Sequence, residues 1–280
     1  MDDQAKVLRQ LAWGQKRKSN YITVSSGKGG VGKTNFVINL AYLLARFRKK
    51  VLVFDADFGL ANVDVLLNLN ARKNIRDYLI DNVGINQIII NSTYGFDILP
   101  AASGFMDIAS FNEQYYNKFI DIFVTIDEKY DYILFDTGAG ISETVVRLAG
   151  IADYFIVITQ AEPAAITEAY ALMKDANQEH GVGKAFLVLN RVTGKNHINI
   201  YENLNRVITK FLKIDLSYLG GIRDDKMVLK AVLRQTPVCN LFPKSHYYAD
   251  LTNVANKLTG TSGNSKKVID FYNFFRRGKK

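Results

Sequence analysis

The sequence predicts an α/β protein with one open, mostly parallel β-sheet and helices on both of its faces. Short apolar runs alternate with longer helical stretches, and several of the runs are apolar at successive positions. A glycine-rich loop at 27–34 also joins the first run to the first helix. Continuous apolar runs suit strands that are buried on both faces of a parallel sheet. Regular alternation of strands and helices implies right-handed β-α-β units.

Seven segments are predicted to be strands, because each is a short run dominated by branched and aromatic apolar side chains. They lie at 21–26, 50–57, 96–101, 131–137, 153–159, 184–190 and 215–222.

Six segments between these runs are predicted to be helices, because their apolar residues recur at helical spacing. The first of them carries its apolar stripe on Phe36, Val37, Leu40, Leu43 and Leu44. The six helices are expected at 33–47, 112–129, 163–178, 197–211, 225–234 and 244–259.

Composition indicates a packed globular chain and excludes some classes of protein. The 280 residues are 48% hydrophobic with 4 prolines, so the core is large and linkers are few. The single cysteine, Cys239, excludes an intrachain disulfide framework and a four-cysteine metal site, and it fits a reducing cytoplasm. We expect no secretory signal and no membrane span. The net charge of +9 permits a nucleotide, a membrane surface or nucleic acid as an acidic partner without choosing among them.

The loop "GKGGVGKT" at 27–34 fits the phosphate-binding pattern G-x-x-x-x-G-K-[ST]. Its backbone N–H groups and the following helix N-terminus would surround phosphate oxygens. Lys33 is expected to reach the β- and γ-phosphates, and the Thr34 hydroxyl is expected to bind Mg²⁺. A second lysine, Lys28, is not explained by the pattern. The expected nucleotide contacts are Gly27, Lys28, Gly29, Gly30, Val31, Gly32, Lys33, Thr34 and Asn35.

Three aspartates follow buried strands and are expected at the same sheet edge as this loop. Asp55 and Asp57 end the second strand, and Asp136 ends the fourth. Ligands bind outside the carboxyl ends of the strands in open α/β sheets. Mg²⁺ keeps several of its waters, so these carboxylates would hold it mostly through water. Gly138 and Gly140 would allow the segment after Asp136 to move with the γ-phosphate.

Several segments resemble one family. The loop is similar to the deviant phosphate-binding loop of the MinD/ParA-type ATPases, over about residues 20–260. Within that class the chain resembles the flagellar-number regulators FlhG, YlxH and FleN. The matching segments are "DQAKVLR" (3–9), "GKTN", "DADFGLANVDVLL" (55–67), "LPAASG" (99–104) and "DTGAGIS" (136–142), with Asn35 where MinD proteins usually have threonine.

This resemblance implies a role for the second lysine. In such ATPases two chains close over two ATP molecules, and the lysine at position 28 would cross to the partner's nucleotide, as an arginine finger does. It also implies that Asp57 orients the attacking water and that Asp55 and Asp136 hold Mg²⁺ through water. Asn190 would read adenine, with residues 222–226 beside the base as a backbone wall.

The resemblance further implies a slow, dimerisation-dependent ATPase that controls flagellar number and placement. It would be cytoplasmic and would bind the inner face of the cell membrane as an ATP dimer. Its partners would be a second copy of itself, an FlhF-type GTPase, flagellar switch-complex or transcription components, and an anionic membrane surface. Nucleic acid is the less favoured partner.

The two ends of the chain are predicted to lie outside the ATPase domain at 20–259. A linker at 260–265 leads to a basic amphipathic helix at 266–280, which would lie in a membrane interface or dock on the core. Its apolar residues are Val268, Ile269, Phe271, Tyr272, Phe274 and Phe275. Residues 1–19 resemble the segment that stimulates the partner GTPase, with Gln4 and Arg9 as expected contacts, although packing on the domain is the alternative.

Other functions remain open at this point. A MinD-type cell-division regulator would share the loop and tail but should lack "DQAKVLR" and Asn35. A ParA-type partition ATPase would use the positive charge on DNA and would not need an aromatic tail. An iron–sulfur carrier built on this fold would need cysteines that the chain lacks. A binding protein without hydrolysis is disfavoured because Lys28, Lys33, Asp57 and Asp136 are all present.

Overall fold

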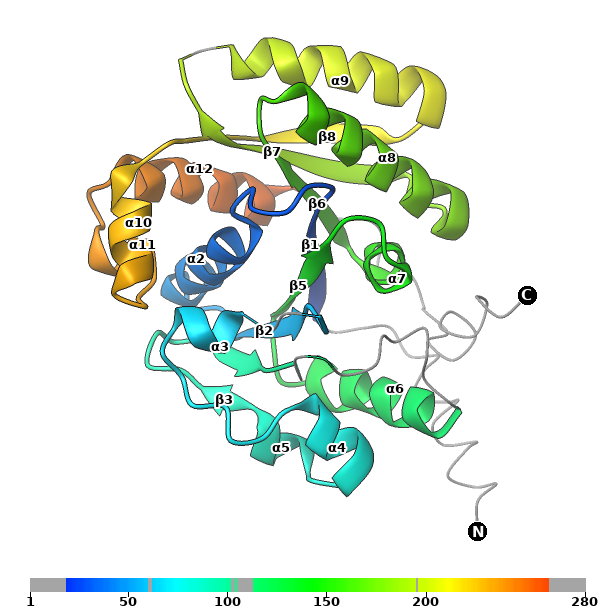
Figure 1. Cartoon of the computed structure of the whole chain (residues 1–280), viewed down its shortest axis with the longest axis vertical. Helices are drawn as coiled ribbons and strands as arrows, with labels where there is room; N and C mark the ends of the chain where they lie inside the picture. The colour runs from blue at the N-terminus through cyan, green and yellow to red at the C-terminus, as the bar shows by residue number, and fades with distance from the viewer. Residues whose placement is uncertain (1–18, 60–61, 102–103, 105–112, 195, 262–280) are drawn as a thin grey trace.

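The computed structural model describes residues 19–59, 62–101, 104, 113–194 and 196–261 (Figure 1). The predicted membrane helix at 266–280 and the contacts assigned to Gln4 and Arg9 lie outside these residues.

An eight-stranded sheet forms the centre of the molecule, in the order β3-β4-β2-β5-β1-β6-β7-β8. Every neighbouring pair is parallel except β3 and β4. All seven predicted strands are present, and the two-residue β3 was not predicted because so short a run carries no period. The strands are β1 (Asn20–Ser26), β2 (Val51–Ala56), β3 (Ile90–Asn91), β4 (Asp97–Leu99), β5 (Tyr132–Ala139), β6 (Tyr154–Thr159), β7 (Lys184–Val192) and β8 (Asp215–Arg223).

The six predicted helices are also present. They are α2 (Lys33–Arg46), α6 (Glu113–Asp127), α8 (Pro163–His180), α9 (His197–Leu212), α10 (Lys226–Leu233) and α12 (His246–Gly260). The prediction omitted α3 (Val63–Leu66), α4 (Ile75–Asp81), α5 (Ile85–Ile88), α7 (Glu143–Ile151) and α11 (Val238–Leu241). Of these, α7 has only nine residues, fewer than the roughly 11–18 over which a helical period is read.

Helices cover both faces of the sheet. α2, α11 and α12 lie on one side, and α6, α7, α8 and α9 lie on the other (Figure 1). Successive residues of a strand therefore enter different cores: Ile22 packs with α2, whereas Tyr21 packs with α6. This two-sided burial explains why the strands are apolar at successive positions. None of the helices in the described part of the chain combines the length and apolar character that a bilayer crossing requires.

The parallel strands bring their carboxyl ends to one edge of the sheet. β1, β2, β5, β6 and β7 are neighbours or near neighbours there, although they are far apart in the sequence. The loop at 27–34 leaves β1 at this edge and enters α2. The topology thus places the three predicted aspartates and Asn190 around the loop.

Candidate functional site

The phosphate-binding loop owes its shape to glycines. Gly30 and Gly32 have φ values of +76° and +93°, a region that disfavours residues with a side chain. Gly32 is the N-cap of α2, so the free N–H groups of the first helical turn face the loop. Gly27 packs directly against α8, where a Cβ would lie 2.4 Å from the carbonyl carbon of Glu168. The loop is therefore held between β1, α2 and α8 with its backbone turned toward a prospective phosphate.

Lys33 is buried and already paired. Its Nζ lies 2.8 Å from Oδ1 of Asp136, and the two side chains are only 9% and 2% exposed. A buried ammonium and carboxylate need each other, because neither retains its hydration shell. In this arrangement Asp136 holds Lys33 at the carboxyl end of β5. A phosphate group bound at the loop would be a second anionic partner for Lys33. If Lys33 turned to it, the buried carboxylate of Asp136 would need a cation in its place.

Asp55 lies beside Asp136 in register on adjacent strands β2 and β5. Burial, and then the charge of Asp136, raise the pKa of Asp55 to about 7, although the backbone N–H groups of Asp57, Asn62 and Val63 lower it. Those groups donate to the carboxylate over 3.1, 2.9 and 3.2 Å. Two buried carboxylates at one edge, one of them reluctant to ionise, fit the binding of a divalent cation.

Asp57 lies at the mouth of the same site and is half-buried. Its own N–H donates to Asp55, and its Oδ1 accepts from the N–H of Gly59 at 3.2 Å. A Cβ built on Gly138 would lie 3.5 Å from this oxygen, so Asp57 faces the segment after β5. Asp57 is thus close to the buried carboxylates but open to solvent, as a residue that orients water would have to be.

Lys28 has an environment opposite to that of Lys33. Its Nζ lies 2.7 Å from Oε2 of Glu162, with the two side chains 42% and 55% exposed. The hydrogen bond with Glu162 raises the pKa of Lys28 and lowers that of the glutamate. Sequence reasoning missed Glu162. The signal that could have found it is an acidic residue just after the end of β6. An acidic residue at the end of a strand was also the criterion that identified Asp55 and Asp136.

Asn190 lies at the end of β7, where its Nδ2 donates to the Val31 carbonyl of the loop at 2.7 Å. The neighbouring segment 222–226 is tied to α12. Arg223 donates to both carboxylate oxygens of Asp250, at 2.8 and 2.7 Å, and Asp225 accepts from the Tyr247 N–H at 3.1 Å. A base-binding wall at this place would therefore be rigid.

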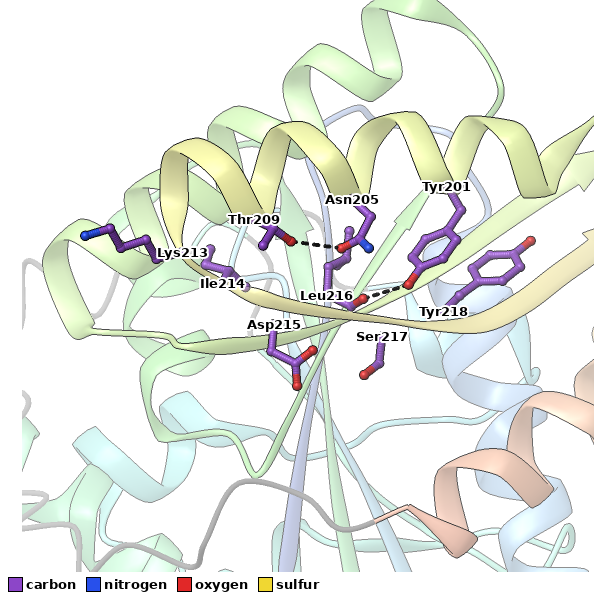
Figure 2. Close-up of a pocket in the computed structure, with 9 residues that line it drawn as sticks. All are labelled: Tyr201, Asn205, Thr209, Lys213, Ile214, Asp215, Leu216, Ser217 and Tyr218. Atoms are coloured by element: carbon purple, nitrogen blue, oxygen red, sulfur yellow. Dashed lines mark hydrogen bonds between the residues drawn. The ribbon is translucent and has the colours of Figure 1, made fainter.

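A hollow of about 800 Å³ lies elsewhere, between α9 and the first half of β8 (Figure 2). Because β8 is parallel to the other strands, this hollow is at the opposite edge of the sheet from the loop. The Tyr201 hydroxyl crosses it and donates to the Leu216 carbonyl at 3.0 Å. None of the predicted nucleotide contacts lines it.

Comparison with known proteins agrees with this geometry. An AAA-domain family model matches residues 19–189. The antiactivator FleN of Pseudomonas aeruginosa is 36% identical over 238 residues, covering 85% of each chain. The chain belongs to the FlhG/FleN group of MinD/ParA-type ATPases.

Other members of this class extend the comparison. The flagellum site-determining protein YlxH of Helicobacter pylori is 32% identical over 87% of this chain and 83% of its own. The septum site-determining protein MinD of Pyrococcus horikoshii, solved with Mg-ADP, has the same fold, with a TM-score of 0.70, 22% identity, and coverage of 86% of this chain and 96% of that one. This FlhG/FleN-type protein is accordingly an ATP hydrolase, one of a family of dimerising ATPases that regulate flagella or cell division.

Proposed function

We propose that this ATPase regulates flagellar number and placement through an ATP-dependent homodimer that binds the membrane and stimulates an FlhF-type GTPase. The observation that carries the proposal is the contrast between the two lysines of one loop. Lys33 is buried on Asp136, whereas Lys28 is exposed beside Glu162. A lysine at the rim of the loop is free to meet a nucleotide held by a second chain.

The proposal assigns a role to each of the site residues. Lys33, Thr34 and the loop backbone hold the triphosphate, and Asp55 and Asp136 hold Mg²⁺ through water. Asp57 orients the attacking water. Lys28 leaves Glu162 and contacts the γ-phosphate in the partner chain, so ADP, which has no γ-phosphate, weakens the dimer.

Membrane attachment would be switched by dimerisation. The apolar residues at 268–275 bury too little surface for one tail to bind firmly. Two tails on one dimer act together, and such pairing raises affinity by about 10²–10⁴-fold. The tail and the activator segment lie outside the described residues, so both assignments rest on the sequence.

The flagellar assignment is supported by the relatives. The proteins named FleN and YlxH are 36% and 32% identical to this chain, and a MinD of Bacillus subtilis is 31% identical. The N-terminal "DQAKVLR" and Asn35 favour the flagellar group over MinD. Its partners would be an FlhF-type GTPase and flagellar switch-complex or transcription components.

The dimer is tested by sedimentation of the purified protein with Mg·ATP, with Mg·ADP and without nucleotide. We expect dimers with ATP alone. Lys28→Ala should still bind ATP but remain a monomer, whereas Lys244→Ala, on an exposed loop before α12, should behave as the wild type. A Lys28→Ala protein that still dimerises with ATP would refute the role of the second lysine.

The membrane assignment is tested by co-sedimentation with liposomes that contain anionic lipid. The full chain should pellet with Mg·ATP and stay in solution with Mg·ADP, and deletion of 266–280 should abolish pelleting without changing ATP affinity. If the deletion leaves pelleting unchanged, the tail does not bind the membrane, and packing on the core of the domain becomes the favoured assignment. Pelleting with DNA in place of liposomes would favour the ParA-type function.

A further inference from the structure

The turn between α2 and β2 exposes five residues in succession, "RFRKK" at 46–50, which we call the basic turn. Four of them carry a positive charge: Arg46, Arg48, Lys49 and Lys50. The fifth, Phe47, has 36% of its surface exposed. None of the ion pairs within the described part of the chain includes any of these four cations. The basic turn therefore presents its charge to the surroundings rather than to an acidic side chain.

The backbone holds the basic turn in one conformation. Arg48 has a φ of +60°, and the Lys49 N–H returns to the Leu44 carbonyl at 3.1 Å, which is the Schellman ending of a helix. The Lys50 N–H then donates to Oδ2 of Asp131 at 2.8 Å, which ties the turn to the residue before β5. The cations are thus mounted on a fixed part of the domain and not on a free loop.

The basic turn lies where the parallel strands begin, which we call the amino edge of the sheet. α2 starts at the phosphate loop and ends at the basic turn, so a helix about 20 Å long separates the two. Val51, the first residue of β2, is level with Tyr132, and Tyr132 is level with Asn20. A dimer that closes over nucleotide at the carboxyl edge therefore leaves the basic turn uncovered.

The C-terminal segment leaves the domain at the same edge. α12 packs beside α2, and at its end the Tyr154 hydroxyl, from the start of β6, donates to the Thr261 carbonyl at 3.0 Å. β2 and β6 are three strand spacings apart, or about 15 Å. Five residue steps lead from Thr261 to Lys266, and they span at most about 17 Å. The predicted membrane helix at 266–280 is therefore within reach of the bilayer that the basic turn would touch.

A hollow of about 310 Å³ adjoins the basic turn at this edge. Lys50 and Lys129 line it together with Asp97. The carboxylate of Asp97 already accepts from the Tyr130 hydroxyl and from Nδ2 of Asn91, each at 2.8 Å. The hollow thus offers two ammonium groups to an anion such as a lipid phosphate, while its own carboxylate is engaged by neighbours.

We propose that the basic turn is a second membrane contact, which the folded domain itself makes with anionic lipid headgroups. The four cations attract the headgroups, and Phe47 enters the interface between headgroups and acyl chains. DNA would meet the same charge, but the exit of the tail at this edge favours a membrane. The inference rests on the membrane assignment of the proposed function and adds which edge of the domain faces the lipid.

The test is co-sedimentation of the full chain and Mg·ATP with two kinds of vesicle. One contains phosphatidylcholine and phosphatidylglycerol in equal parts, and the other contains phosphatidylcholine alone. The basic-turn variant neutralises three cations together: Arg48→Gln, Lys49→Gln and Lys50→Gln. The matched control removes the same net charge from exposed residues on α10 and near the start of α12, the end away from the tail. Its substitutions are Lys230→Gln, Arg234→Gln and Lys244→Gln.

The basic-turn variant should bind the anionic vesicles about 10²-fold more weakly, since each cation at an anionic surface contributes about fivefold. The control should bind them as the wild type does, because charges more than about 10 Å from the lipid are screened by salt. Both variants should bind ATP and dimerise like the wild type. On phosphatidylcholine alone, the wild type and the two variants should not differ.

A fluorescence measurement gives a second readout if the basic-turn variant does not fold. The chain has one tryptophan, Trp13, which is first replaced by phenylalanine. Phe47→Trp in that background should be quenched by brominated lipid in the anionic vesicles. Leu229→Trp, at a position on α10 that is 65% exposed, should not be quenched.

Three results would overturn the inference. Equal weakening in the basic-turn variant and its control would show that only net charge matters. An unquenched Phe47→Trp would show that the turn does not touch lipid. Loss of DNA pelleting with unchanged vesicle binding would assign the turn to nucleic acid. A wild type that ignores anionic vesicles defeats the membrane assignment as a whole, whereas one whose pelleting depends on 266–280 but not on the basic turn defeats this inference alone.

Discussion

Replacing Lys33 with methionine should destabilise the nucleotide-free protein strongly. The substitution keeps the length of the side chain but leaves Asp136 charged and buried beside Asp55. Removing one partner of a buried ion pair costs about 3–5 kcal/mol. A buried carboxylate escapes that cost by binding a proton. Protonating an ordinary aspartate costs about 5 kcal/mol at pH 7.5 and about 1.5 kcal/mol at pH 5. The unfolding free energy that Lys33→Met loses should therefore be much smaller at pH 5.

The assay is urea unfolding of ligand-free protein at pH 7.5 and pH 5. Lys28→Met is the matched control, since its lysine belongs to the same loop and makes an ion pair of nearly equal length, 2.7 against 2.8 Å. Because the Lys28 pair is exposed, that variant should unfold as the wild type does. The reasoning is refuted if the two variants lose the same stability, or if the loss in Lys33→Met is as large at pH 5 as at pH 7.5.

Two further predictions concern the neighbouring acids. The pKa of Asp55, about 7 in the folded protein against 3.8 in the unfolded chain, makes the folded state hold a proton that the unfolded state releases. The unfolding free energy of the ligand-free protein should therefore fall by up to about 4 kcal/mol as pH rises from about 4 to 7. Urea unfolding of Asp55→Asn should lack this pH-dependent fall. An identical pH slope in that variant would exclude Asp55 as the source of the pH dependence. Glu162→Gln releases Lys28 from its intrachain partner, so sedimentation should find more dimer at limiting Mg·ATP. Less dimer in that variant would mean that the glutamate supports the interface instead of competing for the lysine.

Local sequence signals were sufficient to predict that most residues of the candidate nucleotide site lie close together. The loop pattern, its position after an apolar run, and the aspartates at strand ends predicted which residues gather at one edge of the sheet. Parallel topology brings strand ends together whatever the length of chain between them, so Asp55 and Asp136 are neighbours across about eighty residues. The same rule, extended to the third residue after β6, would have found Glu162.

Other features could not be predicted from local sequence patterns. α7 was missed because its nine residues are fewer than the roughly 11–18 over which a helical period is read. A β-bulge at Arg191 was missed because it depends on the pairing of β7 with β8, not on the residues of β7 alone.

By itself, the sequence determined the class of the fold, the phosphate loop and the acidic residues around it, because spacing and strand burial are local properties of the chain. Only the tertiary structure decided the state of each group. It buried Lys33 on Asp136, left Lys28 at the surface beside Glu162, and turned the amide of Asn190 toward Val31. Two lysines five residues apart are chemically identical in the sequence. They differ in the fold because hydration, and with it the strength of a charge pair, depends on what surrounds them in space.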